Sequence, residues 1–354
     1  MSEKMINSLP GKVFLCGKND SSVLDNILFC LKKVNPGAIF RIVDSTGCLN
    51  LEKTMPSAAA TKMLNDEAQL MLLPSVPPFK TQLLKWVGNK QRFAHEIISY
   101  FPSDYNRYIE PFLGSGAVLG TLAPRREAIA ADVYRPLIEI WTCLKNNPAM
   151  LKTWYGERLA RYENEGKKAY NAIKDSFNSA PNGADLLFLC RSCYGGVVRF
   201  RQSDGAMSTP CGAHTPVSLE SFSERVDIWY NRIRHTDFYN QDFDMTLAMA
   251  QSGDVVYCDP PYTYCQSILY GAQNFSLERL IASIRKCKER GVYVLLSIDG
   301  TKKSGKYTCN FHFPDGLFER EAFVNCGRSM LRRFQKDGET LEDELVSDRL
   351  LMTF

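Results

Sequence analysis

From Phe79 onward, short apolar runs alternate with longer segments that have the periodicity of amphipathic helices. The apolar runs lie at residues 107–109, 127–131 and 255–258, and the alternation resumes at Asp237 after an interruption. Apolar runs that alternate in this way with helical segments are typical of a parallel sheet covered by helices. The sequence therefore predicts an α/β fold for this part of the chain.

The last third of the chain supplies further elements of the same sheet. A helix is predicted over residues 276–289 and a strand over 292–296, and the apolar terminus 350–354 is expected to close the sheet.

The interruption reads as an insertion of a different kind. Residues 148 to about 190 are amphipathic and helical, with breaks at Gly166 and at 181–183. Residues 193–216 are rich in Gly, Ser, Arg and aromatic residues, so we expect loops and a hairpin outside the core.

The first part of the chain has the pattern of a small α/β unit. It is expected to hold strands at 13–16, 39–43 and 70–73, helices at 22–34 and 55–65, and a linker at Pro74, Pro77 and Pro78. No chemical motif occurs in this unit. The predicted division is thus 1–76, then 77–147 with 236–354, and 148–235 as the insertion.

Composition narrows the class of protein. A content of 45% hydrophobic and 23% charged residues fits an ordinary globular protein, and a net charge of +4 allows only a local nucleic-acid footprint. No apolar run reaches the length of a membrane span, and the segment that starts at Met1 lacks a secretory core. Twelve cysteines without a signal peptide are expected to be reduced thiols, which predicts a cytoplasmic protein without a membrane partner.

The tetrapeptide Asp259-Pro260-Pro261-Tyr262 follows the apolar run 255–258 and carries the clearest chemistry. A carboxylate and a carbonyl in a rigid turn can both accept hydrogen bonds from an exocyclic amine, while a tyrosine stacks on the ring that bears it. The alternative is a proline turn that only ends a strand.

A second motif, residues 110–116, follows a strand and opens a helix. Its glycines allow the backbone to approach a ligand, and an acid such as Asp132 at the end of the next strand typically accepts from ribose hydroxyls. The alternative is a plain tight turn. Because the phosphate-binding loop pattern is absent, a nucleoside cofactor with few phosphates is favoured over ATP.

Together these motifs resemble a known family. Residues 85–90, 110–116, Asp132, 241–243 and 259–262 occur in the order found in the Dam-type (D12 class, alpha-group) DNA N6-adenine methyltransferases. The resemblance covers about residue 79 to the C-terminus and leaves out the N-terminal unit.

The resemblance implies a Rossmann-like S-adenosyl-L-methionine-dependent methyltransferase sheet, with 148–235 as the inserted target-recognition domain. It implies direct methyl transfer to an adenine flipped out of double-stranded DNA, at a GATC-like site. It also implies a bacterial or phage-encoded enzyme of the cytoplasm, a monomer or weak dimer without a metal, with a partner endonuclease where it serves restriction–modification.

Residue by residue, the resemblance implies the following roles. Asp259, Pro260, Pro261 and Tyr262 are catalytic. The cofactor is bound by Trp86, Lys90, Glu110, Phe112, Gly114, Gly116, Asp132, Asp242, Phe243 and Asp259. Asn89 departs from the family's usual glycine, and a side chain there is expected to narrow the entrance to the pocket.

DNA-binding roles fall mainly on the predicted hairpin. The resemblance assigns them to Lys85, Tyr194, Val197, Arg199, Arg201 and Pro210. Arg199 matches an arginine that reads guanine, and Tyr194 an aromatic that inserts into the duplex. Gly195 and Val197 depart from the family's asparagine and leucine, and the alternative is a basic loop that binds only phosphate.

The sequence also allows other interpretations of the cysteine-rich segment and of the substrate. Cys190, Cys193, Cys211 and His214 have the spacing of a zinc ribbon, although Cys190 belongs to an apolar run expected to face the core. The substrate could instead be RNA or another amino-bearing base, and a DNA-binding regulator with a vestigial transferase core is a further alternative.

Overall fold

The computed structural model describes residues 76–201, 203–261, 275–302, 307–308, 313–328 and 345–354, together with four short strands before residue 76. The main sheet has the strand order β11-β12-β9-β8-β5-β6-β7, and β10 (Tyr307–Thr308) pairs with β9 outside this path. The strands along the path are β11 (Arg320–Arg328), β12 (Leu345–Met352), β9 (Tyr293–Lys302), β8 (Val255–Cys258), β5 (Tyr108–Glu110), β6 (Ala128–Asp132) and β7 (Thr236–Asn240). Every pair from β9 to β7 is parallel, which confirms the predicted α/β class.

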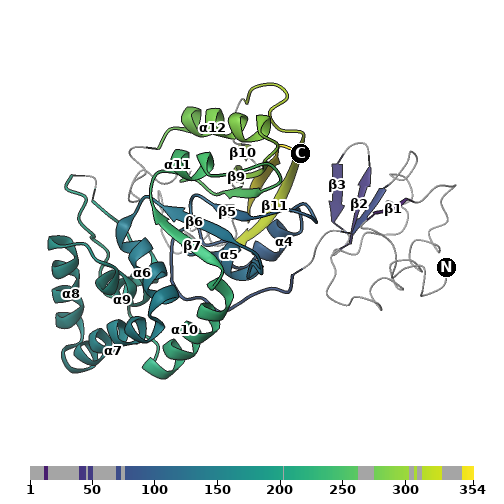
Figure 1. The fold of residues 1–354 in the computed structure, drawn as a ribbon. Coiled ribbons are helices and arrows are strands. Elements are labelled where there is room, and N and C mark those ends of the chain that lie inside the picture. The colour runs from purple at the N-terminus through teal and green to yellow at the C-terminus, as the bar shows by residue number, and fades with distance from the viewer. Residues whose placement is uncertain are drawn as a thin grey trace, which may run out of the picture.

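Both faces of the central strands β5, β6 and β8 are buried, because alternate strand residues point to opposite helix layers. Ile109 and Val256 pack with α11 (Phe243–Ala248) and α12 (Leu277–Glu289) on one face. Tyr108 and Tyr257 belong to the core on the other face, which is covered by α4 (Ala94–Ile98), α5 (Ala117–Leu122) and α6 (Arg135–Asn146) (Figure 1).

The C-terminal strand lies inside the sheet and does not form its edge. β12 runs antiparallel between β9 and β11, with Leu350 and Leu351 buried. The prediction that the terminus joins the sheet is confirmed, and the structure places it one strand in from the β11 edge.

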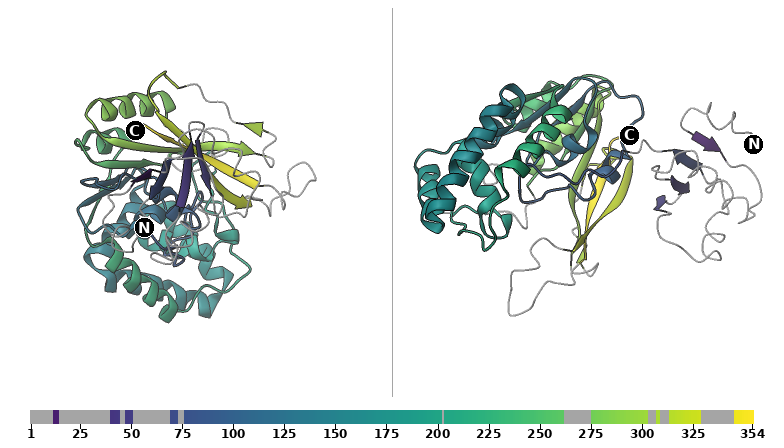
Figure 2. Two further views of the ribbon diagram at one scale, coloured as in Figure 1. Left: turned by 90° about the vertical axis from the view of Figure 1, so that its right-hand side faces the viewer. Right: turned by 90° about the horizontal axis from the view of Figure 1, so that it is seen from below.

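A block of four helices extends from one side of the sheet (Figures 1 and 2). It consists of α7 (Pro148–Glu165), α8 (Lys167–Ser179), α9 (Gly183–Ser192) and α10 (Leu219–Ile233). The predicted breaks are confirmed: Gly166 has φ of +57°, and the Asn182 side chain caps α9 by accepting from the Asp185 N–H. None of the helices in the described part of the chain combines the length and apolar character that a membrane crossing requires.

Residues 193–211 form a hairpin that follows α9. The backbones of Cys193 and Cys211 form an antiparallel β-bridge at its base, where both thiols are free, and Phe200 and Met207 form a second bridge near its tip. The expectation that this segment stays outside the core is wrong for its inner face, where Val198, Phe200 and Met207 are buried in the main core. Those side chains belong to the same core cluster as buried residues of α7, α8 and α9, and no local sequence pattern reveals this.

Helix α8 fastens this hairpin through side chains that bond its backbone. The Asn178 amide donates to the Met207 carbonyl at 3.1 Å and accepts from the Met207 N–H at 2.7 Å. The Tyr170 hydroxyl donates to the Thr209 carbonyl at 2.8 Å. The hairpin is therefore held to a rigid element on one side.

The described strands before residue 76 form a separate antiparallel sheet. Its order is β1 (Lys12–Phe14), β4 (Gln69–Leu72), β2 (Phe40–Asp44) and β3 (Gly47–Asn50). Strands near 13–16, 39–43 and 70–73 were predicted, whereas β3 was not. The helices predicted over 22–34 and 55–65 lie outside the described residues.

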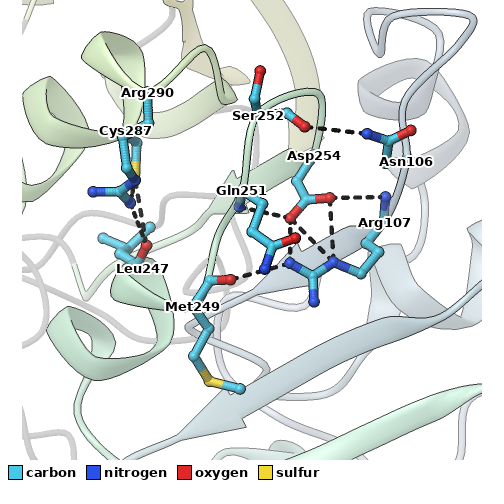
Figure 3. A network of polar contacts seen from close by, with 9 residues as sticks. All are labelled: Asn106, Arg107, Leu247, Met249, Gln251, Ser252, Asp254, Cys287 and Arg290. Atoms are coloured by element: carbon cyan, nitrogen blue, oxygen red, sulfur yellow. Dashed lines mark hydrogen bonds and ion pairs between the residues drawn. The ribbon is translucent and has the colours of Figure 1, made fainter.

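A polar network fastens the amino-terminal ends of the central strands (Figure 3). The Asp254 carboxylate, just before β8, accepts from the Arg107 guanidinium at 2.7 Å and from the backbone N–H of Arg107 at 3.1 Å. It also accepts from the Gln251 N–H at 2.9 Å, and Arg107 donates to the Met249 carbonyl at 3.1 Å. These bonds stabilise the side of the sheet at which the parallel strands begin. The opposite side, at which these strands end, is the usual place for a ligand site in such folds.

Candidate active site

Three acids meet at the carboxyl edge of the main sheet, by which we mean the side at which its parallel strands end. Glu110 ends β5, Asp132 ends β6, and Asp259 directly follows β8. A cavity opens at this edge, and all three acids line it. Nine of the ten residues predicted to bind a cofactor line the cavity: Trp86, Lys90, Glu110, Phe112, Gly114, Asp132, Asp242, Phe243 and Asp259.

The tenth, Gly116, lies behind the cavity wall. It has φ of +62° and precedes α5, and a Cβ at this position would come within 3.0 Å of the Trp141 ring. Gly114 also has positive φ, and its backbone N–H donates to Asp132 at 3.0 Å. The two glycines thus have different roles: Gly114 forms part of the cavity wall, and Gly116 allows the Trp141 ring to pack closely beneath that wall.

Glu110 is a deeply buried acid of the cavity. Only 2% of the residue is exposed, and the Tyr108 hydroxyl donates to its carboxylate at 2.9 Å. Burial raises the pKa of Glu110 well above its ordinary value, and the nearby charges of Asp259 and Asp132 raise it further. No lysine or arginine in the described part of the chain forms an ion pair with Glu110, so the cavity offers an acid that a cationic ligand could pair with.

Asp132 is held in a fixed orientation by the backbone. One carboxylate oxygen accepts from the Gly114 N–H and the other from the Tyr134 N–H, each at 3.0 Å. The two oxygens of one carboxylate are the kind of acceptors that suit a pair of neighbouring ligand hydroxyls.

Three aromatic rings form one wall of the cavity. Phe112 stacks on Phe243 with ring centroids 5.3 Å apart, and Phe275 meets both rings edge-on, at 6.0 Å and 5.9 Å. Such a wall suits a flat heterocycle. Sequence reasoning missed Phe275: its position before the Ser276 cap of α12 indicates an apolar residue at a helix start but no ligand role.

Asp242 stands beside this wall as the cap of α11. It accepts from the Asp244 N–H at 3.0 Å and from the Arg279 guanidinium at 2.9 Å. Arg279 also pairs with Asp244 and lies over the Phe243 ring, 5.0 Å from its centroid. Sequence analysis also missed Arg279, because α12 reaches α11 only through the tertiary packing.

Asp259 faces a lysine across the cavity. The Lys90 ammonium lies 2.9 Å from Asp259 Oδ1 and 3.3 Å from Asp348 Oδ2. Pro260 and Pro261 line the cavity with Asp259, whereas Tyr262 lies outside the described residues. Asp348 was not anticipated from the sequence, where it is one acid in an apolar C-terminal run.

Asn89 does not stand among the cavity-lining residues. Its side-chain oxygen accepts from the Gln91 N–H at 2.7 Å, so it stabilises the local turn. The expected narrowing of the pocket entrance by this side chain is therefore not what the structure shows.

The predicted DNA-contacting residues lie on and beside the 193–211 hairpin with different exposures. Tyr194 is 47% exposed, whereas Val197 is only 7% exposed. Lys85, Arg201 and Pro210 are exposed and Arg199 is partly buried. The Lys85 side chain lies against the hairpin, where a Cβ on Gly196 would meet it at 2.7 Å. Arg201 already pairs with Asp204 at 2.6 Å.

The four residues with zinc-ribbon spacing are not gathered around one point. Cys190 is fully buried, as expected, and its thiol donates to the Leu187 carbonyl at 3.3 Å. Across the described residues, no group of three or more His, Cys, Asp or Glu side chains has a metal-site arrangement.

Comparison with known proteins identifies one family of similar sequences. Residues 86–319 match the model of the D12 class N6 adenine-specific DNA methyltransferase family. A type II methyltransferase of Lactococcus lactis subsp. cremoris, M1.LlaDCHI, is 28% identical over 60% of this chain and 79% of its own length. A DNA adenine methylase of Vibrio cholerae is 27% identical over 60% of this chain and 79% of its own length. A DNA N-6-adenine-methyltransferase of Escherichia phage P1 is 28% identical over 63% of this chain but only 30% of its own length.

Proposed function

This chain belongs to the D12 class N6 adenine-specific DNA methyltransferase family, and on that premise we propose that it methylates adenine N6 at a specific site in double-stranded DNA, with S-adenosyl-L-methionine as donor. The observation that carries the proposal is the single cavity that joins Asp259, Pro260 and Pro261 to Glu110 and a wall of aromatic rings.

The chemistry of the cavity fits this donor. Glu110 would pair with the ammonium of the methionine part, and Asp132 would accept from the ribose hydroxyls. The wall formed by Phe112 and Phe243 would hold the adenine ring, with Asp242 accepting from its amine. When bound, the donor supplies an electrophilic methyl group on a positively charged sulfur.

The protein's own part in the reaction is to make a weak nucleophile stronger. The N6 lone pair of adenine is delocalised into the ring. Hydrogen bonds from N6–H to the Asp259 carboxylate and the Pro260 carbonyl would draw the nitrogen toward tetrahedral geometry and localise that lone pair. The base must leave the duplex to reach this depth, and Tyr262 is proposed to stack on it.

Sequence reading is proposed to belong to 148–235, with 77–147 and 236–354 as the catalytic part. Exposure of Tyr194 and Lys85 beside the hairpin supports contact with DNA there. Arg199 is proposed to read guanine, with Arg201, Val197 and Pro210 shaping the contact at a GATC-like site.

The biological setting is proposed from the relatives. The three relatives described above come from two bacteria and a phage, and one is a type II methyltransferase. We therefore place this enzyme with DNA in the bacterial cytoplasm, with a partner endonuclease where it serves restriction–modification.

The proposal is tested by sequencing plasmid from cells that express the chain, with a readout that reports modified bases. N6-methyladenine is expected at one short motif. Asp259→Ala is expected to lower modification by at least about 100-fold, because it removes the acceptor that activates the amine, while DNA binding persists.

Asp227→Ala is the matched control, since Asp227 is an exposed acid paired with Lys152 on the helical block. It should leave modification intact. Absence of methylated adenine from wild-type plasmid, or transfer of labelled methyl to RNA instead, would contradict the proposal.

A further inference from the structure

One buried cation serves two carboxylates at the active site. The Lys90 ammonium lies 2.9 Å from Asp259 and 3.3 Å from Asp348. The three side chains are only 7%, 17% and 8% exposed, so water screens their charges weakly. Lys90 and Asp259 line the cavity, whereas Asp348 stands behind the lysine.

Asp348 occupies an unusual place in its strand. Along β12 it shares a face with Leu350 and Met352, and both of these belong to the main core. Its neighbour Arg349 pairs with Glu321 of β11 at 2.8 Å. An ionised acid on an apolar strand face is costly unless it is paired, and Lys90 supplies that pairing.

One acid and two groups that are neutral at pH 7 also lie near Asp259. Glu110 faces it from β5, and Tyr257 and Cys258 precede it in β8. Burial raises the pKa of Tyr257, and the charges of both Asp259 and Asp348 raise it further, so the two carboxylates act on the same small volume. Any proton that reaches Asp259 therefore changes the charge balance around Lys90.

We propose that Asp348 is a positioning residue: it shares Lys90 with Asp259 and remains as counter-ion of that lysine when Asp259 takes a proton from the target amine. This inference rests on the proposed methyl transfer. The N6–CH3 bond forms as the S–CH3 bond breaks, and the bonding pair stays on sulfur, which becomes neutral. N6 then carries the positive charge and releases one proton to Asp259, which later passes it to water.

Two consequences follow from this arrangement. In the resting state, the charge of Lys90 is divided between Asp259 and Asp348. In the protonated state, Lys90 would be a buried cation facing a neutral acid, and Asp348 prevents that unfavourable state.

The test is Asp348→Asn, which keeps an oxygen acceptor and removes the charge. We expect kcat to fall on the order of tenfold, with KM for DNA and for the donor nearly unchanged. The acid limb of the kcat/KM profile should move to lower pH, because the whole charge of Lys90 then favours ionised Asp259. In 15N-lysine-labelled protein, hydrogen exchange at the Lys90 ammonium should become faster.

Asp254→Asn is the matched control: it removes a buried carboxylate paired with Arg107 at the opposite edge of the same sheet. It should leave kcat and the pH profile of folded enzyme unchanged. Wild-type kcat, an unmoved acid limb and an unchanged ammonium signal in Asp348→Asn would overturn the inference. Inactive wild-type enzyme would instead refute the proposed function, and the ammonium signal would still decide whether Asp348 holds Lys90.

Discussion

Glu110 illustrates how one residue can carry information about its ligand. A buried acid without a cationic partner among the described residues is stable mainly in its neutral form, which is the reason that its pKa is raised. The raised pKa also means that Glu110 contributes stability to the folded enzyme at low pH. That contribution is lost as pH rises through the pKa in the folded state.

Donor binding is expected to release a proton from Glu110. The ammonium of the donor favours the carboxylate, so affinity should increase with pH below the raised pKa of Glu110, and it should fall again once the donor amine titrates near pH 8. Glu110→Gln should weaken binding by roughly tenfold or more and abolish the pH dependence. Titration calorimetry in buffers of different ionisation enthalpy, between about pH 5 and 7.5, measures both effects.

Glu319→Gln changes an exposed acid that pairs with Lys288 and should behave as wild type. If wild-type affinity were independent of pH and no proton were released, Glu110 would not be the partner of the ammonium.

At the scale of elements, the sequence predicted what local pattern controls and missed what packing controls. Strand–helix alternation places Glu110, Asp132 and Asp259 at strand ends, and the parallel sheet brings strand ends together. Three residues could not be predicted, because each lies in or beside an element whose position depends on tertiary packing. Phe275 lines the cavity, whereas Arg279 and Asp348 form ion pairs with the cavity-lining residues Asp242 and Lys90. The buried inner face of the hairpin was missed for the same reason.

The attachment of the hairpin to α8 gives a prediction at this scale. Asn178→Ala leaves the N–H and carbonyl of Met207 without their side-chain partner, at a cost of about 1–3 kcal/mol. We expect looser hairpin packing and roughly tenfold weaker specific DNA binding, with donor binding unchanged. Fluorescence anisotropy with cognate DNA and hydrogen exchange of the hairpin amides measure the two effects.

Asn231→Ala is the control, since Asn231 bonds only a carbonyl one turn back in its own helix α10 in the described contacts. Equal losses of DNA and donor affinity in Asn178→Ala would mean that the hairpin and the cavity are not separable units.

Across the whole molecule, the two edges of the main sheet have different tasks. The carboxyl edge concentrates acids around a cavity and shares one lysine between two of them. The opposite edge holds Asp254 and Arg107 in a closed network with backbone partners (Figure 3). The acids of the carboxyl edge face a cavity in which a ligand can bind. The Asp254 carboxylate at the opposite edge already has its hydrogen-bond partners within the fold.

This polarity predicts that stability and chemistry can be changed separately. Asp254 is only 1% exposed, and Asp254→Asn leaves the Arg107 guanidinium without its counter-ion, so the free energy of unfolding should fall by about 3 kcal/mol. Urea denaturation followed by circular dichroism measures this loss, and kcat per folded molecule should stay at the wild-type value. Asp348→Asn should show the opposite pattern: kcat should fall by more than the loss of folded protein explains. If Asp254→Asn lowered kcat as strongly as Asp348→Asn, the two edges would be coupled through the sheet, and the division of tasks would be wrong.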